Sequence, residues 1–184
     1  RANTRELATV PYRFGEVRYK HTECIIVPSV SSERREYIPM DYLDAGTIIS
    51  NAAFAVYDAS LWLFGILTSR MHMTWVRTVG GRLKTDYRYS AQLCYNTFPF
   101  PTISSEQREE IAEAAEEVLG VREDYPGLAL ADLYDPDRMP DDLRQAHNRL
   151  DDLVERCYAG YPFATEEARL ECLFKLYEKM TKDE

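Results

Sequence analysis

The sequence has few of the residues from which catalytic and metal sites are built. Its three histidines do not stand at metal-ligand spacing, and its four cysteines form no C-x-x-C pair, which favours buried, reduced thiols over zinc ligands. It has no serine nucleophile motif and no glycine-rich phosphate loop. His147 falls on the apolar face of a predicted helix, where a packed core histidine is the ordinary explanation. We therefore predict that the chain alone is non-catalytic, with no catalytic residue, metal ligand or bound cofactor.

Long hydrophobic runs are also lacking. The longest apolar stretch, Ala52 to Leu67, is interrupted by Asp58 and is shorter than the roughly 20 residues that a bilayer span needs. The first residues contain neither an initiator methionine nor the apolar core of a signal peptide. We expect a piece of a longer cytoplasmic polypeptide, with no membrane partner.

Charge of one sign is concentrated in one half of the chain. The formal net charge of -9 by itself argues against a nucleic-acid partner, because phosphate contacts normally come from a basic surface. Residues 1–103, however, carry 12 Lys and Arg against 9 Asp and Glu, whereas residues 104–184 carry 10 against 22. The acidity belongs to the second half, so the net charge does not exclude nucleic-acid binding by the first.

Residues 1–103 show the pattern of short strands around one long helix. Runs of β-branched and aromatic residues at 24–27, 37–38 and 47–49 predict strands. Apolar residues recur at helical spacing between Ser60 and Val76, which predicts one helix packed against those strands. After the Gly80-Gly81 break, a further strand is predicted from Leu83 to Tyr89.

Residues 104–184 show the pattern of a helical bundle. Two prolines in residues 98–101 end the first region, because they withhold backbone donors. Ser104 followed by Gln107 matches a capping box, and further helices are predicted from Pro140 and from Thr165. We therefore expect an α+β fold with two domains: residues 1–103 with mixed short strands, and residues 104–184 as a small C-terminal helical bundle.

The strand predicted from Leu83 to Tyr89 is the most informative segment. Side chains alternate between the two faces of a strand, so Lys84, Asp86 and Arg88 are predicted on one face. The opposite face then carries Leu83, Thr85, Tyr87 and Tyr89. Such a row suits a DNA major groove, where Lys or Arg donates to guanine and a carboxylate accepts from cytosine, so Lys84 with Asp86 would read one G·C pair. The alternative is a solvated strand face with cross-strand ion pairs, which periodicity alone favours.

Other polar residues of the first half are candidate DNA contacts of lower rank. Serine hydroxyls and arginine side chains are common donors to phosphate, although such residues also occur on ordinary exposed turns and mixed surfaces. The candidates in the loop between predicted strands are Ser31, Ser32, Arg34 and Arg35, and those in and after the predicted helix are Arg70, Arg77 and Arg82.

Several segments resemble one known family. Residues 50–58, 63–75, 81–90 and 95–101 closely resemble the target-recognition region of MmeI-like DNA methyltransferases, the type IIL restriction-modification enzymes. Residues 133–140 and 150–154 are similar to the C-terminal helical domain of that family.

The resemblance implies double-stranded DNA as partner and an upstream adenine-N6 methyltransferase domain in the same polypeptide, in a bacterial or archaeal cell. That domain would use S-adenosylmethionine, and many family members add an endonuclease domain. In the family, the strand matching Lys84, Asp86 and Arg88 supplies base-reading side chains, and a Lys with an Asp at the first two positions is associated with guanine. The loop matching Ser31, Ser32, Arg34 and Arg35 lies near DNA.

Two other functions stay open from the sequence. The helical bundle could dock a separate catalytic chain, as specificity subunits do, and a separate catalytic gene would support this. The chain could also be an autonomous enzyme, which methyl transfer to DNA without an upstream domain would show.

Overall fold

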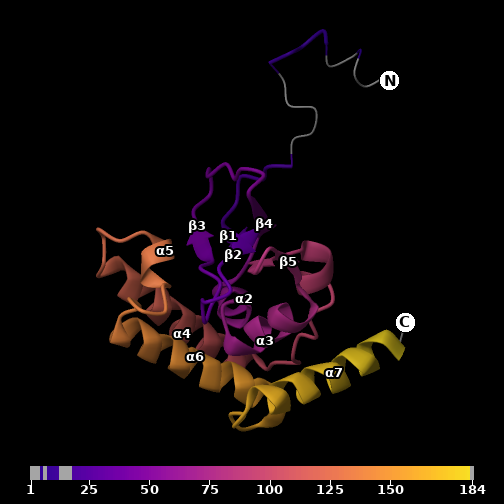
Figure 1. Ribbon diagram of the computed structural model, residues 1–184, viewed down its shortest axis with the longest axis vertical. Coiled ribbons are helices and arrows are strands. Elements are labelled where there is room, and N and C mark those ends of the chain that lie inside the picture. The colour runs from indigo at the N-terminus through magenta and orange to yellow at the C-terminus, as the bar shows by residue number, and fades with distance from the viewer. Residues whose placement is uncertain (1–4, 6–7, 13–17, 183–184) are drawn as a thin grey trace.

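The computed structural model describes residue 5, residues 8–12 and residues 18–182, and its fold is α+β as predicted (Figure 1). In chain order the elements are β1 (Cys24–Pro28), β2 (Val30–Ser31), β3 (Asp41–Leu43), β4 (Ala53–Tyr57), α2 (Leu61–Leu67), α3 (Arg70–Val79), β5 (Gly81–Leu83), β6 (Asp86–Arg88), the π-helix η1 (Ala91–Tyr95), α4 (Ser105–Glu123), α5 (Leu130–Leu133), α6 (Asp141–Ala159) and α7 (Glu166–Lys182). In the described part of the chain, no helix is both long and apolar enough to cross a membrane.

The strands form two small antiparallel sheets, with orders β3-β1-β4 and β2-β6-β5. The strand predicted at residues 24–27 is confirmed as β1, but those predicted at 37–38 and 47–49 are wrong. Tyr37 and Ile38 lie in irregular backbone, and their side chains are buried in the core. Ile48 lies in a loop and is 80% exposed. The β-branched and aromatic residues at 37–38 therefore indicated burial without a strand, and those at 47–49 belong to an exposed loop.

The long helix predicted from Ser60 to Val76 is two helices, α2 and α3, so the prediction of one helix is wrong. Thr68 Oγ1 donates to the Phe64 carbonyl at 2.9 Å and Ser69 Oγ to the Ile66 carbonyl at 2.7 Å, at the end of α2. Ser69 then caps α3 by accepting from the His72 amide. Such side-chain hydrogen bonds compete with the helical ladder, while the apolar period continues across the break.

Helix α2 is buried between the β1 sheet and the C-terminal helices. Phe64 belongs to the same apolar cluster as Ile25 of β1, and Ile66 belongs to the cluster that contains Ile111 of α4 and Leu150 of α6. Figure 1 shows the same order, with α2 and α3 between the strands and the row formed by α4 and α6. A helix that is apolar on opposite faces is stabilised by burial on both sides.

Gly65 lies where α2 meets both long C-terminal helices. A Cβ at this position would stand 2.7 Å from Ile111 Cγ2 and 3.1 Å from Leu150 Cδ1. We predict that Gly65→Ala lowers the free energy of unfolding by about 1–3 kcal/mol, because a close-packed core must shift to admit the methyl group. Chemical denaturation measures this. Gly120→Ala on α4, where a new Cβ meets nothing within 4 Å, is the control and should be neutral or stabilising; equal stability of the two variants would contradict the prediction.

The three helices predicted in the second half are confirmed, and the short helix α5 was not predicted. Ser104 and Gln107 form the predicted capping box at the start of α4. Pro140 precedes the first residue of α6, and Thr165 Oγ1 accepts from the Ala168 amide at the start of α7. Capping chemistry therefore located the start of α4 from sequence, and a proline and the apolar pattern located the starts of α6 and α7.

The two halves of the chain share one core. Tyr37 of the first half stacks on His147 of α6 with ring centroids 4.2 Å apart, and Arg122 of α4 donates to the Met40 carbonyl at 2.9 Å. His147 is fully buried, as predicted, and its Nε2 lies 2.6 Å from Tyr134 Oη. The division at residue 103 stays a proposal, because the apolar cluster around Ile66 includes side chains from both sides of it.

Candidate nucleic-acid interface

The segment that carries Lys84, Asp86 and Arg88 is a β-hairpin, so the prediction of one continuous strand is wrong. Leu83 at the end of β5 pairs with Asp86 at the start of β6, and Lys84 and Thr85 form the turn between them. Lys84 has a φ of 58°, in the left-handed region that hairpin turns use. The turn was not predicted from the sequence, because Lys84 and Thr85 are not the Gly, Asn or Asp residues that usually form such a turn.

The predicted alternation of buried and outward-facing side chains is present within β6 but does not continue through the turn into β5. Tyr87 and Tyr89 are buried, while Asp86 and Arg88 lie on the outer face. Lys84 is exposed at the hairpin tip. Leu83, which the strand prediction placed with the buried tyrosines, is instead 49% exposed, since the turn brings it opposite Asp86 on the same face.

The hairpin lies beside the loop that follows β2. β2 pairs with β6 through Val30 opposite Arg88 and Ser31 opposite Tyr87. The Glu33 amide donates to Asp86 Oδ1 at 3.3 Å, and Oδ2 accepts no hydrogen bond from the described part of the chain. Two candidate segments separated by about fifty residues in sequence thus form one surface.

The two serines of this loop differ in placement. Ser31 is only 3% exposed and faces inward with Tyr87. Ser32 is half-buried, and its Oγ accepts from the Arg34 amide at 3.4 Å. The placement does not favour Ser31 as a DNA contact, whereas Ser32 stays near the surface.

Three of the candidate arginines pair with carboxylates of the acidic half. Arg34 contacts Asp137 at 2.5 Å, Arg70 contacts Asp151 at 3.2 Å, and Arg77 contacts Glu166 at 3.3 Å. Part of the negative charge of the second half therefore neutralises arginines of the first half across their common interface.

The exposure of these three ion pairs separates their roles. Arg34 and Asp137 are 60% and 71% exposed, so this pair is solvent-screened and leaves Arg34 at the surface. Asp151 is fully buried and Arg70 only 26% exposed, so the Arg70 guanidinium is used within the fold. Arg77 is as little exposed as Arg70, at 27%, but its partner Glu166 is 52% exposed, so this pair lies between the other two in burial.

The remaining two arginines are held by neighbouring groups. Arg35 Nη2 donates to the Ala131 carbonyl at 3.2 Å, which ties the loop to α5. Arg82 of β5 is exposed, and its guanidinium lies 4.1 Å from the centre of the Tyr87 ring. Arg82 and Tyr87 therefore pair across the two strands on the hairpin face opposite Asp86 and Arg88.

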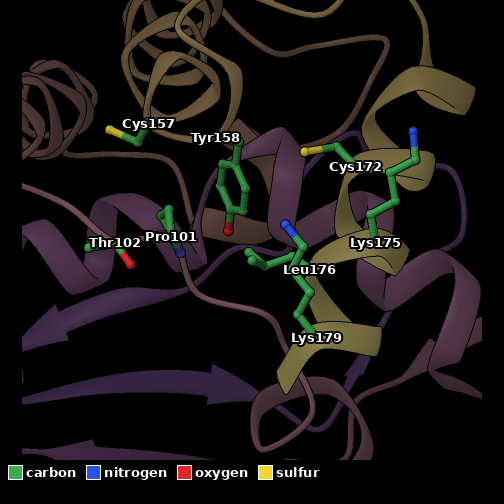
Figure 2. Close-up of a pocket in the computed structure, with 8 residues that line it drawn as sticks. All are labelled: Pro101, Thr102, Cys157, Tyr158, Cys172, Lys175, Leu176 and Lys179. Atoms are coloured by element: carbon green, nitrogen blue, oxygen red, sulfur yellow. The ribbon is translucent and has the colours of Figure 1, made fainter. Parts of the chain in front are cut away.

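The pocket drawn in Figure 2 lies away from the hairpin, between residues 101–102, α6 and α7. Figure 2 shows Cys157 and Cys172 on different sides of the Tyr158 ring, with Lys179 extending from α7. Burial raises the pKa of both thiols above the ordinary value and raises that of the Tyr158 hydroxyl further. Raised pKa values disfavour the reactive thiolate, so neither thiol of this pocket is activated as a nucleophile.

The buried histidines are neutral structural groups. Burial lowers the pKa of His72 to about 3, and its Nε2 lies 3.0 Å from Tyr89 Oη. Burial, followed by the nearby arginines, lowers the pKa of His147 well below its ordinary value. These two rings pack in the core, where each contacts a buried tyrosine hydroxyl.

Comparison with known proteins identifies the family. The model of the MmeI target recognition domain matches residues 1–102, and that of the MmeI C-terminal domain matches residues 103–183. DNA methyltransferase A of Bacillus subtilis (strain 168) is 53% identical over 179 residues, which are 97% of this chain and 20% of that protein.

A solved structure shows the same similarity in three dimensions. The structure of the Type IIL restriction-modification enzyme MmeI in complex with DNA superposes with a TM-score of 0.91 at 42% identity. It covers 99% of this chain and 24% of the MmeI chain, so this chain spans about a quarter of that relative. The chain belongs to the MmeI family and matches its target recognition and C-terminal domains.

Proposed function

We propose that this chain is the sequence-specific duplex-DNA recognition module of an adenine-N6 DNA methyltransferase. The observation that carries the proposal is the single surface formed by the β5–β6 hairpin and the loop after β2, in a chain whose solved relative was determined in complex with DNA. The hairpin is narrow, and a two-stranded ribbon fits the major groove.

Five charged side chains of the hairpin and of the loop after β2 have a role in the proposal. Lys84 donates to the acceptors of a guanine while Asp86 accepts from the amino group of the paired cytosine. Arg88 donates to a second guanine. Arg34 is exposed in the loop after β2, and Arg82 is exposed on the hairpin face opposite Asp86. Both contact phosphates and set the register of the protein on DNA.

Methyl transfer belongs to another domain in this proposal. An upstream methyltransferase domain of the same cytoplasmic polypeptide extrudes the target adenine and supplies S-adenosylmethionine chemistry. No residue of the present chain is assigned to cofactor binding or to the transfer step. Its contribution is to hold the duplex at one sequence, so that the adenine lies where the catalytic domain can reach it.

Substitution of Arg88 tests this function. We predict that Arg88→Ala in the full-length protein weakens binding to the recognised duplex by about tenfold, because one bidentate contact to guanine is lost. Binding to an unrelated duplex should change by less than about twofold, since no phosphate contact is removed. The recognised sequence is obtained first by selecting bound duplexes from a random pool, and affinities are measured by titration.

The control for this experiment is Arg156→Ala on α6, which removes an equally charged, exposed side chain from the acidic half. It should leave both affinities unchanged. Equal losses of Arg88→Ala on the recognised and unrelated duplexes would show that Arg88 contacts phosphate and would contradict its role in base recognition. Failure of the selection to enrich any sequence would overturn the proposed function itself.

A further inference from the structure

An apolar side chain stands within the polar row of the hairpin. Leu83 is 49% exposed at the end of β5 and belongs to neither of the two apolar clusters of the fold. An exposed leucine alone is ordinary. The position of Leu83 is unusual, because its side chain shares the outer face of the hairpin with Asp86 and Arg88.

The strand register fixes which residues neighbour Leu83. Leu83 pairs directly with Asp86, and Arg88 is the next residue of β6 on the same face. Side chains directly opposite in an antiparallel pair have Cβ atoms about 5 Å apart. Successive base pairs are stacked about 3.4 Å apart. A duplex read by Asp86 therefore brings an adjacent base pair against Leu83.

The major-groove edge of DNA contains one apolar group, the 5-methyl group of thymine, and aliphatic side chains recognise it by contact. We infer that Leu83 packs against the 5-methyl group of a thymine next to the base pair read by Lys84 and Asp86, and thereby selects a T·A pair at that position. This inference rests on the proposed function and adds a specificity-determining residue to it.

Removal of single methyl groups from DNA tests the contact. In the full-length protein, each thymine of the selected site is replaced in turn by uracil, which lacks only the 5-methyl group. We expect one such replacement to weaken wild-type binding by about fourfold, the effect of exposing one buried methyl group. Leu83→Ala should bind the thymine and uracil duplexes equally, and Leu83→Met, which keeps an apolar contact, should retain most of the difference.

Leu93→Ala is the matched control, because Leu93 is also 49% exposed but lies on η1, outside the hairpin. This variant should respond to uracil as the wild type does. Thermal unfolding of each variant verifies that it is folded. The inference is overturned if no uracil replacement weakens wild-type binding, or if Leu83→Ala keeps the full wild-type response. An absence of any selected sequence would instead overturn the proposed function, so the two failures are distinguishable.

Discussion

Reversal of Lys84 and Asp86, as Lys84→Asp with Asp86→Lys, will turn the preferred base at one position of the DNA site from guanine to cytosine in the full-length protein. The pair places a donor and an acceptor against one base pair, and reversing them matches the opposite orientation of that pair. One bidentate contact discriminates between bases by about 1–3 kcal/mol, so the preference should reverse by about tenfold or more. Selection of bound duplexes from a random pool measures the change.

The backbone of the hairpin tolerates this reversal. Lys84 has a positive φ, and aspartate adopts that region more readily than most residues do. Asp86 begins β6 on an outer face, where a lysine side chain reaches solvent. The loss of the hydrogen bond from the Glu33 amide to Asp86 is the main local cost.

Reversal of Glu171 and Lys175 on α7 is the matched control, since it exchanges the same kinds of charge within another exposed pair and keeps the net charge. It should leave the recognised sequence unchanged. A hairpin variant that selects the wild-type sequence at every position would show that Lys84 and Asp86 do not read bases.

Asp151→Ala will lower the free energy of unfolding by about 3–5 kcal/mol at neutral pH. Asp151 is fully buried, accepts from Tyr37 Oη and from the Arg70 amide, both at 2.6 Å, and pairs with the Arg70 guanidinium. Its removal leaves these donors without their acceptor between the two halves of the chain. Chemical denaturation measures the loss. The neighbouring Asp152→Ala, at an exposed position of the same helix, is the control and should change stability little.

The cost of Asp151→Ala should also depend on pH. Burial raises the pKa of Asp151 from 3.8 to about 6 in the folded chain, although Arg70 and Tyr37 oppose the shift. Between these values the folded state binds more protons than the unfolded state, so this carboxyl stabilises the fold most below about pH 4 and least above about pH 6. The substitution should therefore cost about 1 kcal/mol more at pH 5 than at pH 7. A larger cost at pH 7 would contradict this interpretation of the network.

Local sequence patterns predicted helices and strands correctly where interactions between neighbouring residues control the structure. The capping box at Ser104 predicted the start of α4, because the hydrogen bonds that define it join residues three apart. The apolar run at residues 24–27 predicted β1. The same reasoning failed at Thr68 and Ser69, because the helical period of apolar residues continues through the break between α2 and α3.

The candidate site was predicted only in part. Sequence periodicity and family resemblance selected Lys84, Asp86 and Arg88, and the structure places all three on the hairpin, where their contacts with DNA stay a prediction. The turn at Lys84 and Thr85 was missed, since it has no glycine or asparagine signal. The outward position of Leu83 followed from that turn and could not be inferred without it.

By itself, the sequence determined the fold class, the starts of α4, α6 and α7, the separation of charge between the halves and the resemblance to the MmeI family. Only the tertiary structure decided that Arg34, Arg70 and Arg77 pair with carboxylates of the acidic half, and that the loop after β2 lies beside the hairpin. The physical reason is the range of the interactions. Periodicity and capping depend on residues within a few positions of each other, whereas ion pairs and strand register join segments that meet only when the core forms.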